Sequence, residues 1–545
     1  MRRLTLLVAS LLALVFATSA AASPIFVLTG RGWGHGIGMS QWGAQGLALH
    51  GATHQEILAR YYEGTTLGTR TGTVRVLLTS GRTSFSFGSP QKISGGGKSV
   101  PAGTYSVHRS GTNVVFGGKS WASGTSFSSA GLLSVDGQRF RGKVRIYASG
   151  SLSAVNVLPL DSYVQGVVAN ESPASWRAQA LQAQADAARS YALAAGGHCG
   201  NAVIGSGVLC RGTSDQVYGG VDSETLSTNA AVAATRGEVV MNGSSVATTF
   251  FFSTSGGKTV NKGEEWGPPD ISYLQTEDDP YDDISPHHRW GPNDPEDDCP
   301  GPGRDCVFTA AGMSTRLGIA GIKDMKVGLR NSGSRVERVN IATASGSPTR
   351  TGASLRTALG LRSTWFTIGV LNVTPSKLKS VCGSRVRLNV VVRNVAGVTL
   401  QQRPASGGAW QNLAVTSTGP DTFTAVHKPC RATVYRLDSP SATGADVKVR
   451  VAPLIVFDDT QPAAGTALKG KVRPLSLAGR TVNVERKRAD GTWRHVGSAT
   501  VRSDGTGTWR ANFNVVEGTY RARITPPSGS GLIPGVSPPL TVQFG

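Results

Sequence analysis

The 545-residue chain has few charged residues, few cysteines and, beyond its first 25 residues, no long hydrophobic run. Since a membrane-spanning helix needs about 18 apolar residues in succession, none is predicted after that point. Glycine is frequent, with 70 residues, but a Gly-X-Y period is absent, which excludes collagen. Hydrophobic residues make up 39% of the chain, which is enough to build real cores and argues against general disorder.

Several common catalytic signatures are also missing. The alternating glycines from Gly30 to Gly38 never place a third glycine as the dinucleotide-binding pattern requires, and no phosphate-loop Gly-Lys-Ser/Thr follows them. Such glycines allow another chain or a ligand to approach the backbone closely, and Trp33 and Trp42 would then suit stacking on a sugar. The alternative is a tightly packed structural loop. The hydroxyl-rich turn after Phe250 lacks the leading glycine of a serine-hydrolase elbow, but it suits recognition of hydroxyl groups.

The N-terminus has the form of a secretion signal. Arg2 and Arg3 precede an apolar stretch from Leu4 to Phe16, and three alanines end at Ala22 before Ser23. We expect residues 1–22 to be a cleaved signal peptide, and the mature protein to be secreted or in the cell wall without a stable membrane anchor.

The six cysteines fit an oxidising compartment. They fall into local pairs, and among fifteen possible pairings we favour Cys199–Cys210, Cys299–Cys306 and Cys382–Cys430. A zinc site at His198, Cys199 and Cys210 is the less favoured alternative, because the spacing of these residues is not that of a structural zinc finger. No other metal or cofactor is expected.

Positive charge is concentrated in the C-terminal part. From residue 370 onward there are 23 basic and nine acidic residues. On an exported protein such a basic surface suits an anionic cell-wall polymer. Nucleic acid is the usual partner of a chain with a pI near 10.1, but export argues against it. A basic surface that is merely solvated is the other interpretation.

The hydrophobic pattern predicts an α+β main domain followed by two all-β, immunoglobulin-like sandwiches. The main domain covers 23–370, with a glycine-rich segment at 23–73, short alternating strands at 74–153 and a core at 154–370. Residues 160–196 are rich in alanine and predict two helices that are interrupted near Glu171, with Asp161 and Ser175 as N-caps. The sandwiches are expected at 371–452 and 453–545.

Glu171 is the strongest candidate for chemistry. It is predicted to end a helix, Pro173 prevents the helix from continuing, and Val167 and Val168 provide an apolar setting. Partial burial would raise the pKa of this carboxyl, as a general acid for glycoside cleavage requires at neutral pH. A solvated carboxylate at a helix end is the alternative.

Four separated motifs together resemble the stage II sporulation protein D (SpoIID) / amidase enhancer (LytB) family of cell-wall proteins. These motifs are LPLDSYVQGVVANESPASWRAQALQAQADAARSYAL, TSDQVYGG, TTFFFSTSGGKT with EEWGPPDISYLQTEDDPYD, and GRGWGHGIGMSQWGAQGLA, with weaker support from SPHHRW and TGASLRTALGLRSTWF. In the usual family order the Gly-Trp-Gly-His-Gly segment closes the domain, whereas here it comes first. The resemblance therefore implies a circular permutation, in which Ile25–Leu28 pairs with the strand around Trp365–Val370.

Sporulation-type members of this family are lytic transglycosylases, and Glu171 matches their catalytic glutamate. The resemblance implies that this chain cleaves peptidoglycan glycan strands to 1,6-anhydro-muramic ends, with one carboxyl serving as acid and then base. Further residues of the motifs are expected to contribute to a sugar-binding groove: His35, Gln41, Arg189, Tyr191, Gln216, Tyr218, Ser253 and Ser255. Zinc near the His198–Cys210 loop occurs in some members.

Two other functions remain open. The amidase-enhancer name implies a non-catalytic wall-binding protein that stimulates a separate cell-wall amidase, and such a protein would tolerate Gln at position 171. An adhesin whose sandwiches carry the function is a third possibility.

Overall fold

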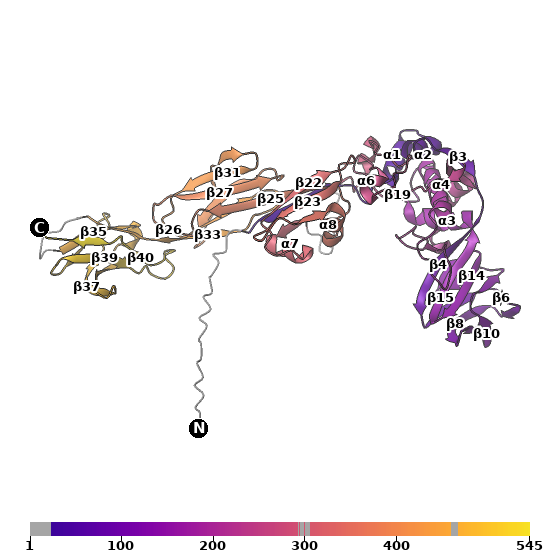
Figure 1. The fold of residues 1–545 in the computed structure, drawn as a ribbon, viewed down its shortest axis with the longest axis horizontal. Coiled ribbons are helices and arrows are strands. Elements are labelled where there is room, and N and C mark those ends of the chain that lie inside the picture. The colour runs from indigo at the N-terminus through magenta and orange to yellow at the C-terminus, as the bar shows by residue number, and fades with distance from the viewer. Residues whose placement is uncertain (1–22, 293, 295–298, 300–305, 459–466, 545) are drawn as a thin grey trace, which may run out of the picture.

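The computed structural model describes residues 23–292, 294, 299, 306–458 and 467–544. The molecule is elongated, with most of its helices and a β-rich subdomain at one end and two β-rich modules toward the C-terminus (Figure 1). In these described parts, no helix is long and apolar enough to cross a membrane. The predicted signal peptide at 1–22 lies outside the described residues.

The β-rich subdomain forms from two sheets that enclose one apolar core, which confirms the strands expected at 74–153. Its strands are short because glycine turns with positive φ separate them. The strands are β4 (Thr73–Arg82), β5 (Ser84–Ser89), β6 (Ile93–Gly95), β7 (Lys98–Val100), β8 (Gly103–Ser110), β9 (Asn113–Phe116), β10 (Lys119–Ala122), β11 (Thr125–Ser129), β12 (Leu133–Val135), β13 (Gln138–Phe140), β14 (Lys143–Ser149) and β15 (Ser151–Pro159), with β16 (Leu209–Cys210) parallel to β4.

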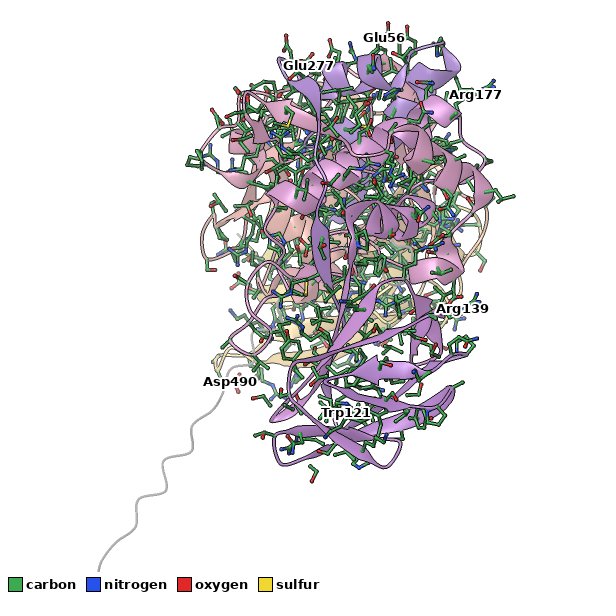
Figure 2. All side chains as sticks on the ribbon, turned by 90° about the vertical axis from the view of Figure 1, so that its right-hand side faces the viewer. Glu56, Trp121, Arg139, Arg177, Glu277 and Asp490 are labelled. Atoms are coloured by element: carbon green, nitrogen blue, oxygen red, sulfur yellow. A yellow bond between two sulfur atoms is a disulfide. The ribbon has the colours of Figure 1, made fainter. Side chains whose placement is uncertain are left out.

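A layer of helices and short strands lies against this subdomain. In Figure 2 it carries Glu56 and Arg177, above the sheets that carry Trp121 and Arg139. Its elements are β2 (Met39–Ser40), α1 (Gln41–Leu49), α2 (His54–Tyr61), β3 (Thr66–Thr69), α3 (Leu160–Glu171), α4 (Ala178–Ala194), η1 (Gly220–Ser223), α5 (Leu226–Ala234), β17 (Glu238–Asn242), β18 (Ser245–Val246), β19 (Phe251–Phe252), α6 (Lys262–Trp266) and η2 (Pro280–Ile284).

Helix α4 is the centre of this layer. Ala185 and Ala188 belong to the core shared with the β-rich subdomain, whereas Ala183 and Ala187 belong to a second core with α1 and α2. Small side chains on both faces let neighbouring elements approach closely, which explains the alanine-rich composition. The two predicted helices and their interruption after Glu171 are confirmed.

The predicted N-caps were wrong. The N-cap positions are Pro159 for α3 and Arg177 for α4, and neither supplies a side-chain hydrogen bond to the helix. Asp161 lies inside the first turn of α3, where its Oδ1 accepts a hydrogen bond from Arg189 Nε at 2.9 Å. Its carboxylate therefore serves a tertiary ion pair instead of the helix end.

The alternating glycines pack against the Phe250–Gly257 segment of the same chain. A Cβ on Gly38 would lie 2.2 Å from the Phe250 carbonyl oxygen, and one on Gly32 would lie 2.6 Å from that of Thr254. Both glycines also have positive φ. Of the two interpretations drawn from the sequence, the structure therefore favours the tightly packed loop at these positions.

β1 (Ile25–Arg31) runs antiparallel to β25 (Phe366–Pro375), with Ile25 opposite Leu371 and Gly30 opposite Phe366. The predicted pairing of these distant segments is confirmed. Around them lie β20 (Arg289–Trp290), β21 (Val307–Thr309), α7 (Ala310–Leu317), β22 (Asp324–Arg330), β23 (Val336–Ala342), β24 (Thr349–Thr351) and α8 (Gly352–Leu359). They share a core with the inner faces of β1 and β25.

The C-terminal part contains two β-sandwich regions, each with its own core. The first uses β26 (Lys379–Val381), β27 (Val386–Arg393), β28 (Thr399–Pro404), β29 (Gln411–Leu413), β30 (Thr416–Gly419), β31 (Thr422–His427), β32 (Thr433–Asp438) and β33 (Val447–Ala452). The second uses β34 (Leu454–Phe457), β35 (Ala467–Arg473), η3 (Leu475–Leu477), β36 (Thr481–Lys487), β37 (Trp493–Thr500), β38 (Thr508–Asn512), β39 (Gly518–Ile524), β40 (Gly535–Val536) and β41 (Leu540–Val542).

The strand at the predicted boundary near residue 370 is shared. β25 pairs with β1 on one side and with β27 on the other, so a single sheet continues from the main domain into the first sandwich. Ile25 and Val27 pack in that sandwich's core. A break at residue 370 would therefore cut through a central strand.

The cysteine pairing predicted from the sequence is confirmed, with disulfides Cys199–Cys210, Cys299–Cys306 and Cys382–Cys430.

Candidate active site

Glu171 is the last residue of α3, and the residue is partly exposed while its carboxyl is largely buried. Oε1 accepts a hydrogen bond from the Val217 backbone N–H at 2.8 Å. Oε2 faces Gln41 Nε2 at 3.4 Å, which is a long and weak contact. The firm bond occupies Oε1, so Oε2 is the oxygen available to carry a proton.

The environment of this carboxyl favours its protonated form. Burial raises the pKa of Glu171, and the hydrogen bonds from Val217 and Gln41 only partly oppose that effect. In the described residues no ion pair involves this carboxyl, so removal of water outweighs the stabilisation of the anion. The raised pKa expected from the sequence is thus supported by a specific cause.

Gln41 reaches Glu171 from 130 positions away in the chain. The segment before it is fixed by the parallel pairing of β2 with β19. Ser40 caps α1 by accepting a hydrogen bond from Gly43 N, and its hydroxyl donates to Asp282 Oδ1 at 2.6 Å. The first residue of α1 is therefore held rigidly beside the end of α3.

Two tryptophans lie close to each other near this point. Trp42 follows Gln41 and Trp176 follows Glu171 by five residues, with ring centroids 5.0 Å apart, and both rings are partly exposed. Trp42 also donates its backbone N–H to the Ser253 carbonyl at 3.0 Å. Trp176 was missed by the sequence reasoning, although its position just beyond Glu171 was a usable signal. Trp33, the other predicted stacking residue, instead lies against Arg362 and His287.

Three of the expected sugar-binding residues are in the interior. Arg189 is fully buried and bonds Asp161 and Asp186. Gln216 accepts a hydrogen bond from Tyr163, and Tyr218 donates to Asn156. These bonds hold α3, α4 and the 215–218 segment in place behind Glu171, and burial keeps the three side chains from the surface. Their position is that of framework residues.

Tyr191 and Ser255 are also buried, while Ser253 is partly exposed. The Tyr191 hydroxyl donates to Asp215 Oδ1 at 3.0 Å, and burial raises the pKa of this phenol. Ser255 Oγ accepts from the Gly257 N–H, and its own N–H donates to Asp282. Of these three residues, only Ser253 has a side chain with appreciable exposure.

His35 is held as a neutral imidazole. Its Nδ1 accepts the Ile37 N–H at 3.0 Å, so Nε2 carries the proton and donates to the Phe251 carbonyl at 3.1 Å. Burial and the nearby Arg335 lower the pKa of His35 to about 3. Packed against Phe252 and Trp266, it contributes to the structure of the glycine segment.

The loop considered for zinc has a different arrangement. Cys199 and Cys210 are joined to each other, so neither offers a thiolate ligand. His198 Nδ1 contacts Asp215 Oδ1 at 2.5 Å, and Asp215 Oδ2 accepts the Cys210 N–H. The donor set expected for zinc is therefore already engaged in other bonds.

A surface cavity of about 360 Å³ lies elsewhere, beside β1, β20 and β25, where Arg31, Trp290 and Trp365 line it. Glu171 is not among its lining residues. The case for the candidate active site therefore depends on the partial exposure and partners of Glu171, not on this cavity.

Residues 148–242 match the family model described as Stage II sporulation protein (SpoIID). Among curated proteins, the chain is 30% identical over 235 residues to "Stage II sporulation protein D" of Bacillus subtilis (strain 168), covering 41% of this chain and 64% of that protein. It is 31% identical over 159 residues to "Amidase enhancer" of the same organism, covering 29% of this chain and 21% of that protein. The chain thus spans less than two thirds of either relative.

Among solved structures, the titin Ig tandem domains A164–A165 are 12% identical, with 32% of this chain and 95% of that chain covered at a TM-score of 0.15.

The residues that match the family model include all of α3 and α4, and therefore Glu171. The resemblance inferred from the motifs is confirmed: residues 148–242 match the SpoIID family model, and the chain is similar to both a stage II sporulation protein D and an amidase enhancer.

Proposed function

We propose that this protein is an exported peptidoglycan lytic transglycosylase in which Glu171 is the general acid and base. The observation that carries the proposal is one partly exposed glutamate at the end of α3, whose carboxyl has a raised pKa and is held by neutral donors. A role at the cell wall is supported by the family match and by the amidase enhancer relative.

The proposed reaction needs a single carboxyl. Protonated Glu171 gives its proton from Oε2 to the glycosidic oxygen as the bond to muramic acid C1 breaks. The resulting carboxylate then takes the proton of the C6 hydroxyl, whose oxygen bonds to C1 and leaves a 1,6-anhydro end. No water is consumed, so the second carboxylate of ordinary glycosidases is not required.

The surrounding groups suit a sugar polymer. Trp42 and Trp176 offer partly exposed aromatic faces, against which sugar rings stack. Gln41 is buried, and its amide, which contacts both Glu171 Oε2 and Gln184 Oε1 at 3.4 Å, supports the carboxyl from the protein side. The Val217 N–H orients the carboxyl throughout, because its bond to Oε1 is compatible with both protonation states.

A non-catalytic role is the second candidate, and the 31% identity to the amidase enhancer favours it. In that case the chain binds the wall and stimulates a separate cell-wall amidase. We further propose that the sandwich regions are immunoglobulin-like modules, whose net positive charge holds the protein to anionic wall polymers. Such binding weakens as salt is added.

The decisive experiment digests purified glycan strands with residues 23–545 and with the Glu171→Gln variant. Anhydro-muramic ends are measured by mass spectrometry. Glu63→Gln, which alters an exposed carboxylate two residues beyond α2, is the matched control. If Glu171 is the catalytic acid, anhydro-muramic ends should form with the wild type and with Glu63→Gln, but not with Glu171→Gln.

Two outcomes would contradict that assignment in different ways. Equal product from Glu171→Gln would exclude Glu171 as the acid. No product from any variant, together with faster turnover of a purified cell-wall amidase when the chain is added, would establish the enhancer instead.

A further inference from the structure

A second cluster of polar groups lies where α2, α4 and β17 meet. His54 is the first residue of α2, Asp186 is in the middle of α4, and Glu238 begins β17. One donor atom from each lies within 4.8 Å of the other two. His54 Nε2 is 3.0 Å from Glu238 Oε1 and 3.9 Å from Asp186 Oδ2.

Hydrogen bonds to the backbone N–H and to Nδ1 of His54 fix the position of its ring. A capping box between Thr53 and Glu56 sets the start of α2. Gln179 Oε1 accepts the His54 backbone N–H at 2.6 Å, which identifies that atom as the amide oxygen. It also lies 3.1 Å from Nδ1, and since an oxygen of this kind only accepts, Nδ1 carries a proton. Nε2 is thereby directed at the two carboxylates.

Asp186 supplies the least satisfied atom of the cluster. Its side chain is fully buried, and Oδ1 accepts a hydrogen bond from Arg189 Nη1 at 2.8 Å. Within the described residues, Oδ2 has no hydrogen-bond partner. The Thr235 hydroxyl lies close enough to this carboxyl to lower its pKa, but its hydrogen bond in the structure is to the Ala231 carbonyl, at 3.2 Å. A buried carboxylate oxygen without a hydrogen-bond donor costs free energy, and a cation bound to Oδ2 would offset that cost.

The charges around the cluster also favour a cation. Asp186 and Glu238 face His54 directly, Asp161 lies on the far side of Arg189, and Arg189 is the only guanidinium bonded to them in the described residues. When the three carboxyls are ionised and His54 is neutral, their charge exceeds that of Arg189 by two, which a divalent ion would neutralise. Without an ion, burial and the charge of Glu238 raise the pKa of Asp186 to about 8.

We propose that His54 Nε2, Asp186 Oδ2 and Glu238 Oε1 bind one divalent cation of the zinc class. Ligand atoms at about 2.1 Å from a tetrahedral ion stand roughly 3.4 Å apart, and this value lies between the 3.0 and 3.9 Å distances from His54 Nε2 to the two carboxylate oxygens. One imidazole with two carboxylates suits Zn²⁺ or a neighbouring first-row ion. The Gln179 oxygen on Nδ1–H is the outer contact that orients a ligating histidine.

The site is open to an arriving ion, because the His54 and Glu238 side chains are 16% and 28% exposed. A water would complete the fourth position. The bound ion would join α2, α4 and β17, and would thus stabilise the layer that carries Glu171. This inference does not depend on the proposed function.

The test uses the tag-free chain of residues 23–545, treated with EDTA and then dialysed. Calorimetric titration with ZnCl₂ should show one equivalent bound, and Tm should rise with free Zn²⁺ because the ion binds only the folded protein. Millimolar Mg²⁺ should not displace Zn²⁺.

Three variants locate the binding. Glu238→Gln and His54→Gln each remove one ligand and should abolish the saturable binding and the Tm rise. Gln179→Ala leaves all ligands in place and should weaken binding on the order of tenfold to a hundredfold. Asp186→Asn is not suitable alone, since it also removes the negative charge that is paired with Arg189.

Matched controls are His108→Gln and Glu63→Gln, which alter exposed residues of the same types and should leave binding unchanged. The proposal is overturned if the wild type shows no saturable Zn²⁺ binding, which would make the cluster an imidazolium–carboxylate ion pair. It is also overturned if binding survives in His54→Gln and Glu238→Gln but is lost in His198→Gln.

Discussion

The end of α3 and the middle of α4 each hold a carboxyl with a raised pKa, but their partners differ. Within the part of the chain that the structure describes, Glu171 is bonded only to the neutral Val217 N–H and the Gln41 amide, and the residue is partly exposed. Asp186 is fully buried, bonded to Arg189 and close to Glu238, whose charge helps burial to raise its pKa. Glu171 can gain or lose a proton without breaking an ion pair, whereas Asp186 cannot. A raised pKa therefore identifies a catalytic acid only together with neutral partners and exposure.

The largest expected effect is on the cleavage rate, which should depend on the Glu171 carboxyl. Glu171→Gln removes the only proton donor of the proposed reaction, so anhydro-end formation should fall by about 10²–10⁴-fold. Thermal stability should change little, because the amide keeps the bond from Val217 and removes a desolvated acid. Initial rates on glycan strands, with melting curves of both proteins, measure this. A folded variant that retains the wild-type rate would contradict the comparison.

The next largest effect is on folding stability, which should depend on the ion pair of Asp186 with Arg189. Arg189→Met leaves the buried Asp186 and the partly exposed Asp161 without their cation, which should cost about 3–5 kcal/mol of unfolding free energy. Urea denaturation measures the loss, and Arg177→Met, at an exposed arginine just before α4, is the control. If both variants unfold at the same urea concentration, the Asp186 network contributes nothing to the fold.

Much of the arrangement around Glu171 followed from the sequence. Proline at 173 ends α3, alternating apolar residues give the strands of the β-rich subdomain, and the order of the family motifs led to the pairing of β1 with β25. These features depend on local chemistry or on recognisable motifs. The contact between Gln41 and Glu171 could be predicted from the sequence only because both residues lie in such motifs.

Other features were not accessible in this way. Arg189 and Gln216 are polar and lie within the motifs, so they were assigned to sugar binding, yet each is buried among internal partners. The sequence does not say which face of an alanine-rich helix is covered when both faces are. The meeting of His54, Asp186 and Glu238 depends on tertiary packing across 184 positions and carries no local signal.

A smaller effect concerns how stability changes with pH. Because the folded state raises the pKa of Glu171 above its ordinary value, the folded protein binds this proton more tightly than the unfolded chain. Stability from this group is therefore full at low pH and is lost as pH rises through the raised pKa. The Tm of the wild type relative to Glu171→Gln should fall between pH 4 and pH 8. A constant difference would show that the pKa is not raised.

The smallest effect on cleavage is expected from removing the second sandwich, residues 453–545. Its core is separate from those that hold Glu171 and Asp186, so the rate on soluble glycan strands should stay within about twofold of wild type, whereas binding to intact walls should weaken. The cut must follow β33, since removal from 371 would divide β25 and expose the inner face of β1. Pull-down on purified walls at low and high salt measures the binding. A large loss of cleavage on soluble strands would place part of the function in the sandwich, as an adhesin-like role requires.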